Sequence, residues 1–257
     1  MIPKIIHYCW LSDDPIPKDL QEYMKTWQIH LNDYEFILWD LHRFDINSSI
    51  WVKQAFDSKK YAFAADFIRL FAVYNMGGFY MDMDVEVKKS FNDLIDKPYI
   101  FGMESPDLIE AGIFGAEKEN KFIGEVLNYY NKRRFILSDG KFDVRPLPSI
   151  FKEVLCQKYE IAFVTDGNVL FEDNKIYVFP MDYFTARDWP YRNYYITKST
   201  YTVHHFAGSW TPQRYKIKSI IKKYIRTYLG EKSVQIIIDM KKCAYKKLGL
   251  KINDNYI

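Results

Sequence analysis

Two aspartates separated by one residue are the part of this sequence best suited to chemistry. Asp82 and Asp84 end the apolar run 79–84, directly after Gly77-Gly78. Residues i and i+2 of a strand point to the same face, so we expect both carboxylates to project together from a buried strand. Neighbouring carboxylates raise each other's pKa unless a cation lies between them. Mg²⁺ and Mn²⁺ prefer oxygen ligands and usually bind with substrate phosphates, so the pattern predicts a metal–diphosphate site. The competing interpretation is a pair of turn residues at a strand end.

A second charged pair precedes these aspartates in an otherwise apolar segment. Asp66 and Arg69 are three residues apart, which places them on one face of a helix predicted over 60–76. Gly77-Gly78 would end that helix. The pair is either a structural ion pair between helix and sheet or a pair of side chains that face the ligand of the aspartates.

A third group of polar side chains lies in the segment 204–210, His-His-Phe-Ala-Gly-Ser-Trp. An imidazole is a suitable third protein ligand for Mn²⁺. Ser209 and the indole N–H of Trp210 can donate to phosphate oxygens, and Gly208 allows close backbone approach. Trp10 ends the first predicted strand and could stack on a nucleotide base. The alternatives are a strand that ends in a turn, for the segment, and core packing, for Trp10.

The elements that must position these residues alternate along the chain. Apolar runs predict strands over 4–10, 34–39, 79–84, 98–102, 112–115, 175–179 and 201–206. Helical spacing predicts helices over 18–31, 49–57, 60–76, 119–132 and 147–157. Such alternation indicates an α/β fold, in which ligands bind at the carboxyl ends of strands.

Composition narrows the class of protein. The 257 residues are 48% hydrophobic and 18% aromatic, which excludes a disordered chain. No stretch is long and apolar enough to cross a membrane, and no signal peptide is recognisable, so we expect a cytoplasmic protein. The three cysteines are far apart, without a CxxC pair, and indicate neither a disulfide framework nor a zinc site.

The charge is divided unevenly. Residues 211–257 contain twelve Lys/Arg and three Asp/Glu, a net charge of +9, so residues 1–210 carry −6 of the total +3. We expect a catalytic domain over 1–210 and a basic amphipathic helical tail over 211–257. The tail could contact the inner face of an anionic membrane or pack on the body. Its basic residues form no recognisable RNA-binding motif, and the body is acidic, so we expect no nucleic-acid partner.

Taken together and in this order, the motifs resemble a known family. They are Ile2-Pro3-Lys4-Ile5-Ile6-His7 with Trp10, Leu38-Trp39-Asp40, Ala65-Asp66 with Arg69, the Gly77–Asp84 segment, and His205-Phe206 with Gly208-Ser209-Trp210. The chain is similar to the family 32 glycosyltransferases with a DXD sugar-binding region, which include yeast mannosyltransferases and bacterial capsular-polysaccharide transferases. The clostridial glucosylating toxins are more distant relatives.

The resemblance implies a GT-A fold, Mn²⁺ or Mg²⁺, a nucleotide-diphosphate sugar and retention of anomeric configuration. Among donors, it favours a UDP-sugar over a GDP-sugar. The acceptor would be a glycan or a lipid-linked glycan, in capsular or surface polysaccharide synthesis. One departure concerns 110–115, where this chain has Glu110 or Ala111 in a place that many relatives fill with Asn.

The resemblance also implies a role for each matching residue. Asp82, Asp84 and His205 would bind the metal, and Asp82 would also contact the ribose or sugar. The remaining residues would bind the donor: the base by Trp10, the sugar by Asp66 and Arg69, and the β-phosphate by Ser209 and Trp210. Two other functions use the same aspartates, namely a metal-dependent phosphohydrolase or nucleotidyltransferase, and a non-catalytic sugar-nucleotide binding module.

Overall fold

A computed structural model describes residues 1–164, 171–172, 174–188 and 193–207. By its internal contacts the chain divides into two units, Met1–Asp188 with Tyr194–Phe206, and Trp189–Asn193 with Ala207–Ile257. The first unit contains the elements described below. The predicted boundary at residue 210, the basic tail, Ser209 and Trp210 lie outside the described residues.

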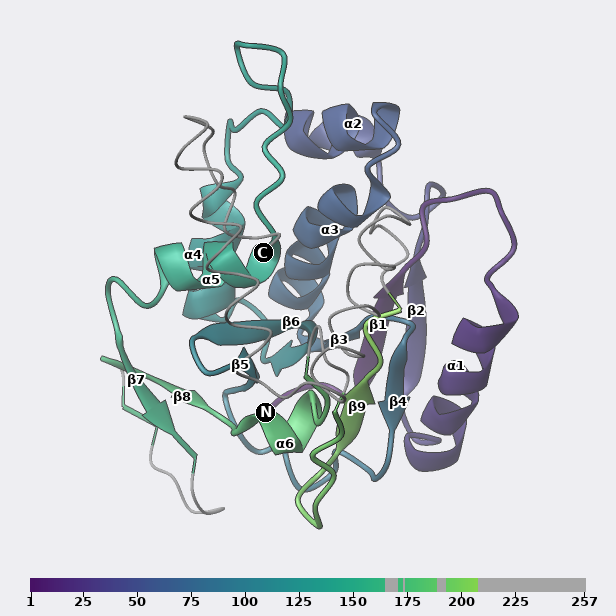
Figure 1. Ribbon diagram of the computed structural model, residues 1–257, viewed down its shortest axis with the longest axis vertical. Helices are drawn as coiled ribbons and strands as arrows, with labels where there is room; N and C mark the ends of the chain where they lie inside the picture. Colours follow the sequence, from purple (N-terminus) through teal and green to yellow (C-terminus); the bar gives the residue numbers. More distant parts are fainter. Residues whose placement is uncertain (165–170, 173, 189–192, 208–257) are drawn as a thin grey trace, which may run out of the picture. The chain divides into compact units, whose positions relative to one another are not determined.

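The central feature is a five-stranded mixed sheet in the order β2-β1-β3-β6-β5 (Figure 1). β1 runs parallel to β2 and β3, whereas β6 is antiparallel to β3 and to β5. The strands of this sheet are β1 (Ile5–Cys9), β2 (Glu35–Trp39), β3 (Gly78–Met81), β5 (Tyr99–Ser105) and β6 (Leu108–Ala116). Two smaller sheets pair β4 (Val85–Val87) with β9 (Thr202–His204), and β7 (Glu160–Phe163) with β8 (Lys175–Val178).

Helices cover the central sheet and enclose its apolar side chains. On one face α3 packs on β1 and β3, α5 packs on β6, and α2 and α4 pack on α3. On the other face Trp27 of α1 contacts Tyr8 and Phe36, with ring centroids 5.7 and 6.4 Å apart. The helices are α1 (Lys18–His30), α2 (Ile50–Asp57), α3 (Tyr61–Met76), α4 (Lys121–Tyr129), α5 (Leu147–Val154) and α6 (Met181–Phe184), with a 3₁₀ turn over Ile46–Ser48. Among the described residues, no helix combines the length and apolar character needed to cross a bilayer.

The structure confirms the α/β class and corrects one strand. The predicted strand over 79–84 ends at Met81, so Asp82 and Asp84 lie in the turn between β3 and β4 rather than in a strand. The Asp82 N–H makes a last hydrogen bond to the carbonyl of Gly112, and the Val85 N–H closes the turn on the Asp82 carbonyl. The turn interpretation of the aspartates is therefore right about their backbone, but it does not account for what surrounds their carboxylates.

Candidate metal and donor site

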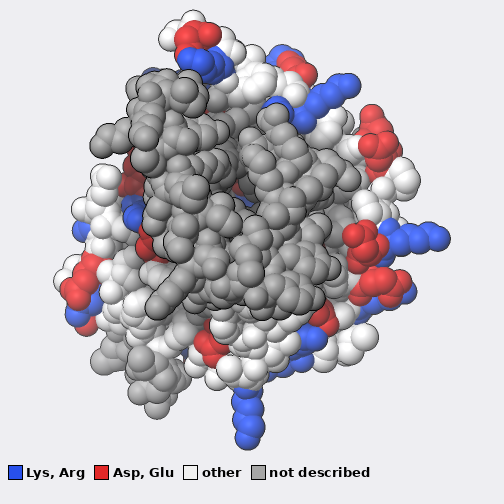
Figure 2. Space-filling model, in the orientation of Figure 1, with Lys and Arg blue, Asp and Glu red and all other residues white. Residues whose placement is uncertain are grey.

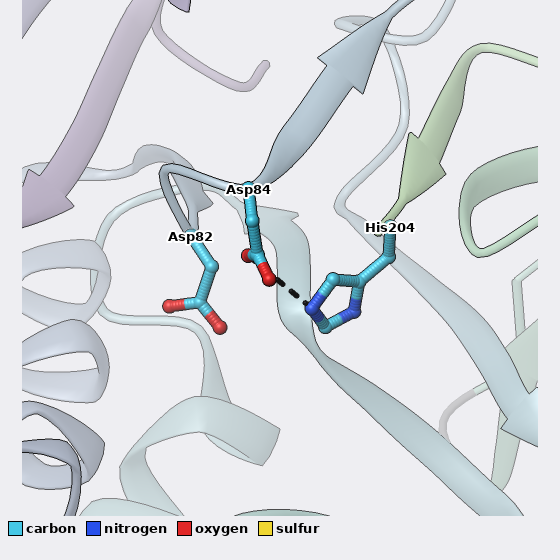
Figure 3. A group of neighbouring side chains, drawn as sticks. All are labelled: Asp82, Asp84 and His204. Carbon is cyan, nitrogen blue, oxygen red and sulfur yellow. Dashed lines mark ion pairs between the residues drawn. The ribbon is translucent and has the colours of Figure 1, made fainter. Parts of the chain in front are cut away.

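Asp82 and Asp84 face a histidine that arrives from the far end of the described chain. β9 pairs antiparallel with β4, with Val85 opposite His204. This register places Nε2 of His204 3.4 Å from Oδ1 of Asp84. Figure 3 shows the two carboxylates and the imidazole turned toward one space. One ligand atom from each of the three residues lies within 4.8 Å of the others, so the group could hold a metal ion.

Arg69 links this group to helix α3. Its guanidinium lies 3.3 Å from Oδ1 of Asp66 and 3.3 Å from Oδ1 of Asp82, and it donates to the carbonyl of Ala111 at 2.7 Å. The Tyr80 hydroxyl also donates to Asp82, at 2.7 Å. Asp66 and Arg69 are both buried. The structure therefore shows the ion pair between helix and sheet, in which Arg69 also touches one of the site aspartates; that the pair faces a bound ligand stays a prediction.

The predicted ligand His205 lies on the other side of β9. Its Nε2 contacts Glu86 Oε2 at 2.9 Å and its Nδ1 lies 3.0 Å from an Arg187 nitrogen. Its ring stacks on Tyr23 of α1, with centroids 4.1 Å apart. Because side chains alternate along a strand, neighbouring histidines at the end of β9 face different surroundings. The structure brings His204, and not His205, to the aspartates, so His204 replaces His205 in the proposal below.

A buried carboxylate to which the sequence assigned no role in the metal site lies behind His204. Glu110 of β6 is fully buried, and its Oε1 and Oε2 lie 3.1 and 3.2 Å from Nδ1 of His204. The Gly112 N–H and the Thr185 hydroxyl also donate to it, each at 2.7 Å. A lone Glu in an apolar strand is the signal that could have indicated it, because an unpaired carboxylate is rarely buried.

Trp10 directly follows strand β1, and no contact between Trp10 and the two aspartates is recorded among the described residues. Its indole N–H donates to the carbonyl of Asp14 at 2.7 Å. Burial raises the pKa of the adjacent Cys9 thiol to about 12, and the charges of Arg69 and Asp82 also act on that thiol. The end of β1 is thus close enough to the site for the charges of Arg69 and Asp82 to shift the pKa of Cys9. The stacking role of Trp10 stays a prediction.

The electrostatics of the site follow from burial and from the ion pairs. Burial raises the pKa of Asp66 to about 6, although Arg69 opposes the shift. Burial also raises the pKa of Asp82, Arg69 lowers it, and Asp84 raises it again. Burial would lower the pKa of His204, but Glu110 and Asp84 raise it well above its ordinary value. This group of acids therefore favours a positive charge between its members, whether a proton on His204 or a metal ion.

The donor set fits a divalent metal. Two carboxylates and an imidazole suit Mn²⁺, and an octahedral ion would keep open positions for substrate oxygens. The side chains of Asp84 and His204 are 13% and 9% exposed, whereas that of Asp82 is 29% exposed, so Asp82 is the most accessible of the three.

Comparisons with known proteins match part of the chain to glycosyltransferases. Residues 17–101 match the model of the glycosyltransferase sugar-binding region containing the DXD motif. Inositol phosphoceramide mannosyltransferase 3 of Schizosaccharomyces pombe is 30% identical over 130 residues, which are 49% of this chain and 36% of that protein. Mannosyl phosphorylinositol ceramide synthase SUR1 of Saccharomyces cerevisiae is 30% identical over 144 residues, which are 53% of this chain and 37% of that protein. The chain thus spans little more than a third of the length of these two relatives.

A viral relative and two solved structures match more of the chain at lower identity. Glycosyltransferase L373 of Acanthamoeba polyphaga mimivirus is 23% identical over 224 residues, covering 82% of this chain and 85% of that protein. The PaToxG glycosyltransferase structure covers 61% of this chain and 68% of its own, with 20% identity and a TM-score of 0.45. A glycosyltransferase involved in the glycosylation of the PBCV-1 major capsid covers 84% and 98%, with 12% identity and a TM-score of 0.37. The resemblance predicted from the motifs is confirmed by the family match, in which residues 17–101 match the glycosyltransferase sugar-binding region that contains a DXD motif.

Proposed function

We propose that this chain is a metal-dependent glycosyltransferase of GT-A fold that moves a hexose from a nucleotide-diphosphate sugar to a glycan acceptor. The observation that carries the proposal is the convergence of Asp82, Asp84 and His204, with one ligand atom from each within 4.8 Å of the others. The two aspartates belong to the family match and the histidine reaches them from a separate part of the chain. Mn²⁺ or Mg²⁺ bound there would neutralise charge on the departing diphosphate.

The other site residues have roles that follow from their surroundings. Arg69 is fixed by three acceptors, so its guanidinium is held in place before substrate arrives, which favours electrostatic stabilisation. Asp66 is buried beside Arg69. It can accept a hydrogen bond from a sugar hydroxyl only if that hydroxyl comes within reach of its carboxylate. Ser209 and Trp210, as β-phosphate donors, and Trp10, as a base platform, remain part of the proposal from the sequence.

For the reaction itself we propose retention of configuration by front-face attack. The bond between the anomeric carbon and the diphosphate oxygen breaks, the acceptor hydroxyl oxygen forms the new bond on the same face, and its proton passes to the leaving phosphate. The aspartates next to the proposed metal are engaged by Arg69 and His204, which leaves neither of them as an unpaired nucleophile. A trapped glycosyl-enzyme adduct would contradict this pathway.

Two lines of argument on the donor sugar give different answers. The motifs favour a UDP-sugar, whereas the fungal relatives are named mannosyltransferases, which favours a mannosyl donor. Sugar choice depends on a few pocket contacts, so both nucleotides belong in the test. The same relatives are named for an inositol phosphoceramide, which supports a lipid-linked acceptor for this chain, in surface or capsular polysaccharide synthesis.

A lipid-linked acceptor would make membrane contact useful. Residues 211–257 carry a net charge of +9 and a helical spacing of apolar residues. We propose that this segment attaches a cytoplasmic enzyme to the inner face of an anionic membrane.

The test of the function is donor hydrolysis with a panel of UDP- and GDP-sugars, each with Mn²⁺ and with EDTA. We expect turnover of one donor, abolished by EDTA and reduced at least about 100-fold in Asp84→Ala, a loss of roughly 3 kcal/mol in transition-state stabilisation. Asp139→Ala is the matched control, because Asp139 pairs only with the exposed Lys141 in the described residues. Failure of every donor to bind folded protein in the presence of metal would refute the proposal.

A further inference from the structure

Glu110 is a carboxylate without contact to solvent, and each of its described hydrogen bonds points to the metal site or its wall. Its Oε1 accepts from the Gly112 N–H at 2.7 Å, and its Oε2 lies 2.7 Å from the Thr185 hydroxyl, whose one hydrogen is shared with the Met103 carbonyl at 2.8 Å. Both oxygens lie within 3.2 Å of Nδ1 of His204. A carboxylate in this setting can only accept, so Nδ1 of His204 carries a proton and donates it.

The ring of His204 is enclosed on two further sides. Phe206 stacks on it, with centroids 4.0 Å apart and an angle of 26° between the rings. To make this contact Phe206 adopts φ +48°, a left-handed conformation that costs a phenylalanine free energy. Gly112 forms the third side, since a Cβ there would lie 2.6 Å from Cε1 of His204. The ring thus has one orientation, with Nδ1 on Glu110 and Nε2 toward Asp84.

We propose that Glu110 is a positioning residue of the metal site, which holds the His204 ring so that Nε2 faces the metal position beside Asp84. The inference rests on the proposed function for its metal, but the orientation of the ring is a property of the chain itself. A carboxylate on the far nitrogen of a histidine ligand fixes its tautomer and orientation, and its removal typically costs 10- to 100-fold in metal affinity.

The neighbouring histidine shows why this arrangement is specific. His205 also has a carboxylate partner, but Glu86 holds it through Nε2, and Arg187 lies on its Nδ1. Both nitrogens of His205 are therefore used by protein groups, and His205 is not part of the group that could hold a metal ion. Only the Glu110–His204 pair, among the described histidines, leaves a ring nitrogen directed at the two aspartates.

The experiment compares three variants that remove one carboxylate each. Glu110→Met fills a similar volume and offers no acceptor to Nδ1. Glu110→Gln has the same charge as Glu110→Met, but its amide oxygen can still accept from His204 and Gly112 while its NH₂ donates to Thr185. Glu86→Met is the matched control on the other histidine. Differences between the two Glu110 variants therefore report the hydrogen bond and not the lost charge.

The first readout is the Kd for Mn²⁺, measured by electron paramagnetic resonance with and without UDP and GDP. We expect Glu110→Met to weaken binding about 10- to 100-fold, Glu110→Gln to recover at least about fivefold of that loss, and Glu86→Met to change the Kd less than about threefold. Equal weakening by Met and Gln would assign the effect to charge and overturn the proposal, as would no weakening by either.

The second readout needs no metal and uses wild type and Glu110→Gln, the variant most certain to fold. Long-range ¹⁵N–¹H spectra of the histidine side chains report whether each ring nitrogen carries a proton. We expect a proton on Nδ1 of His204 in the wild type, whether the ring is charged or neutral, and in the variant a population with Nδ1 unprotonated, or exchange broadening. Identical His204 spectra in the two proteins would overturn the positioning role. Absence of Mn²⁺ binding to the wild type would instead refute the metal-dependent function, while these spectra would still decide the role of Glu110.

Discussion

Arg69 is the single residue on which most of the site geometry depends. Its guanidinium contacts Asp66, Asp82 and the carbonyl of Ala111, which belong to α3, the β3–β4 turn and β6. A planar fork with several donors can satisfy acceptors in different directions at once, whereas an ammonium on a flexible stem cannot. The position therefore requires arginine in particular, and not only a positive charge.

We predict that Arg69→Lys lowers the free energy of unfolding by about 1–3 kcal/mol, because one or more buried acceptors lose their donor. The measurement is urea unfolding at pH 7. Arg145→Lys is the control, since Arg145 is 38% exposed and pairs with Asp143 and Glu153 near the surface. There we expect a loss below about 1 kcal/mol. Equal losses in the two variants would contradict the special role of Arg69.

His7 is a buried histidine whose protonation state is determined by its neighbours. The Trp39 indole N–H can only donate, so Nδ1 of His7 accepts from it, and Nε2 donates to the Gly77 carbonyl. Burial lowers the pKa of His7 to about 4, from an ordinary value near 6.5. Below pH 6.5 the unfolded chain binds a proton that the folded chain excludes, so stability falls as the pH drops from 6.5 toward 4.

From this shift we predict that the titration of His7 lowers the free energy of unfolding of the wild type by about 2 kcal/mol when the pH falls from 7 to 5. His7→Gln, which can accept from Trp39 and donate to Gly77, should lack that part of the pH dependence. Urea unfolding at the two pH values measures it. Parallel pH curves for wild type and variant would show that His7 titrates normally in the folded state.

The charged residues of the site could be predicted from the sequence, whereas the histidine that joins them could not. Asp82, Asp84, Asp66 and Arg69 could be predicted because charged residues in apolar runs need partners, and the structure does bring them together. The choice between His204 and His205 depends on the register of β9 against β4, which joins residues more than 100 positions apart. No local sequence pattern contains that register. The pairing of Glu110 with His204 could not be predicted for the same reason.

Among the elements, strand β6 contacts most of the site residues. Its Glu110, Ala111 and Gly112 contact His204, Arg69 and Asp82 in turn. The absence of a side chain at Gly112 is part of this arrangement, because a Cβ would lie 2.6 Å from His204 and 3.1 Å from Asp82 Oδ2. The strand therefore fixes both the approach and the spacing of the proposed ligands.

We predict that Gly112→Ala weakens Mn²⁺ binding by about 10-fold or more, because the displaced His204 ring loses its orientation. Isothermal titration of Mn²⁺ measures this. Gly124→Ala on α4 is the control, since its Cβ would meet the edge of Tyr74, 2.8 Å away, and not the site. That variant should alter stability without altering the Kd. Unchanged metal binding in Gly112→Ala would exclude a tight enclosure of His204.

Helix and strand positions were predicted well where the pattern is long. The helix over 60–76 and the Gly-Gly break correspond to α3 and its end, where Gly77 has φ +69° and Gly78 has φ +98°. The short strands β4 and β7 were not predicted, and β6 is longer than expected. A strand of three or four residues shows little alternation, and the equally short β8 and β9 could be predicted only from the longer runs 175–179 and 201–206 around them.

On the scale of the whole molecule, charge separates the described body from the C-terminal segment. On the face shown in Figure 2, Lys and Arg side chains of the described residues lie beside Asp and Glu side chains rather than in a patch of one sign. Among the described residues, ion pairs join Lys152 to Asp107 and Lys158 to Glu125. The basic excess resides in residues 211–257.

We predict that this excess makes membrane binding depend on anionic lipid and on salt, because surface charges are screened within about 10 Å at 0.1 M ionic strength. Sedimentation with liposomes that contain anionic lipid, with and without residues 211–257, measures it. Truncation should remove most of the bound protein, whereas liposomes of neutral lipid should bind neither form. Equal binding of the truncated and full chains would place the contact elsewhere.

The central claim is that Asp82, Asp84 and His204 hold the metal that activates a nucleotide-sugar donor. The most direct measurement is donor turnover against Mn²⁺ concentration for His204→Ala and His205→Ala, each first shown to be folded by circular dichroism. The account predicts that His204→Ala loses about 100-fold or more of the metal-dependent rate, roughly 3 kcal/mol, while His205→Ala retains most of it. Loss in His205→Ala with retention in His204→Ala would contradict the site described here.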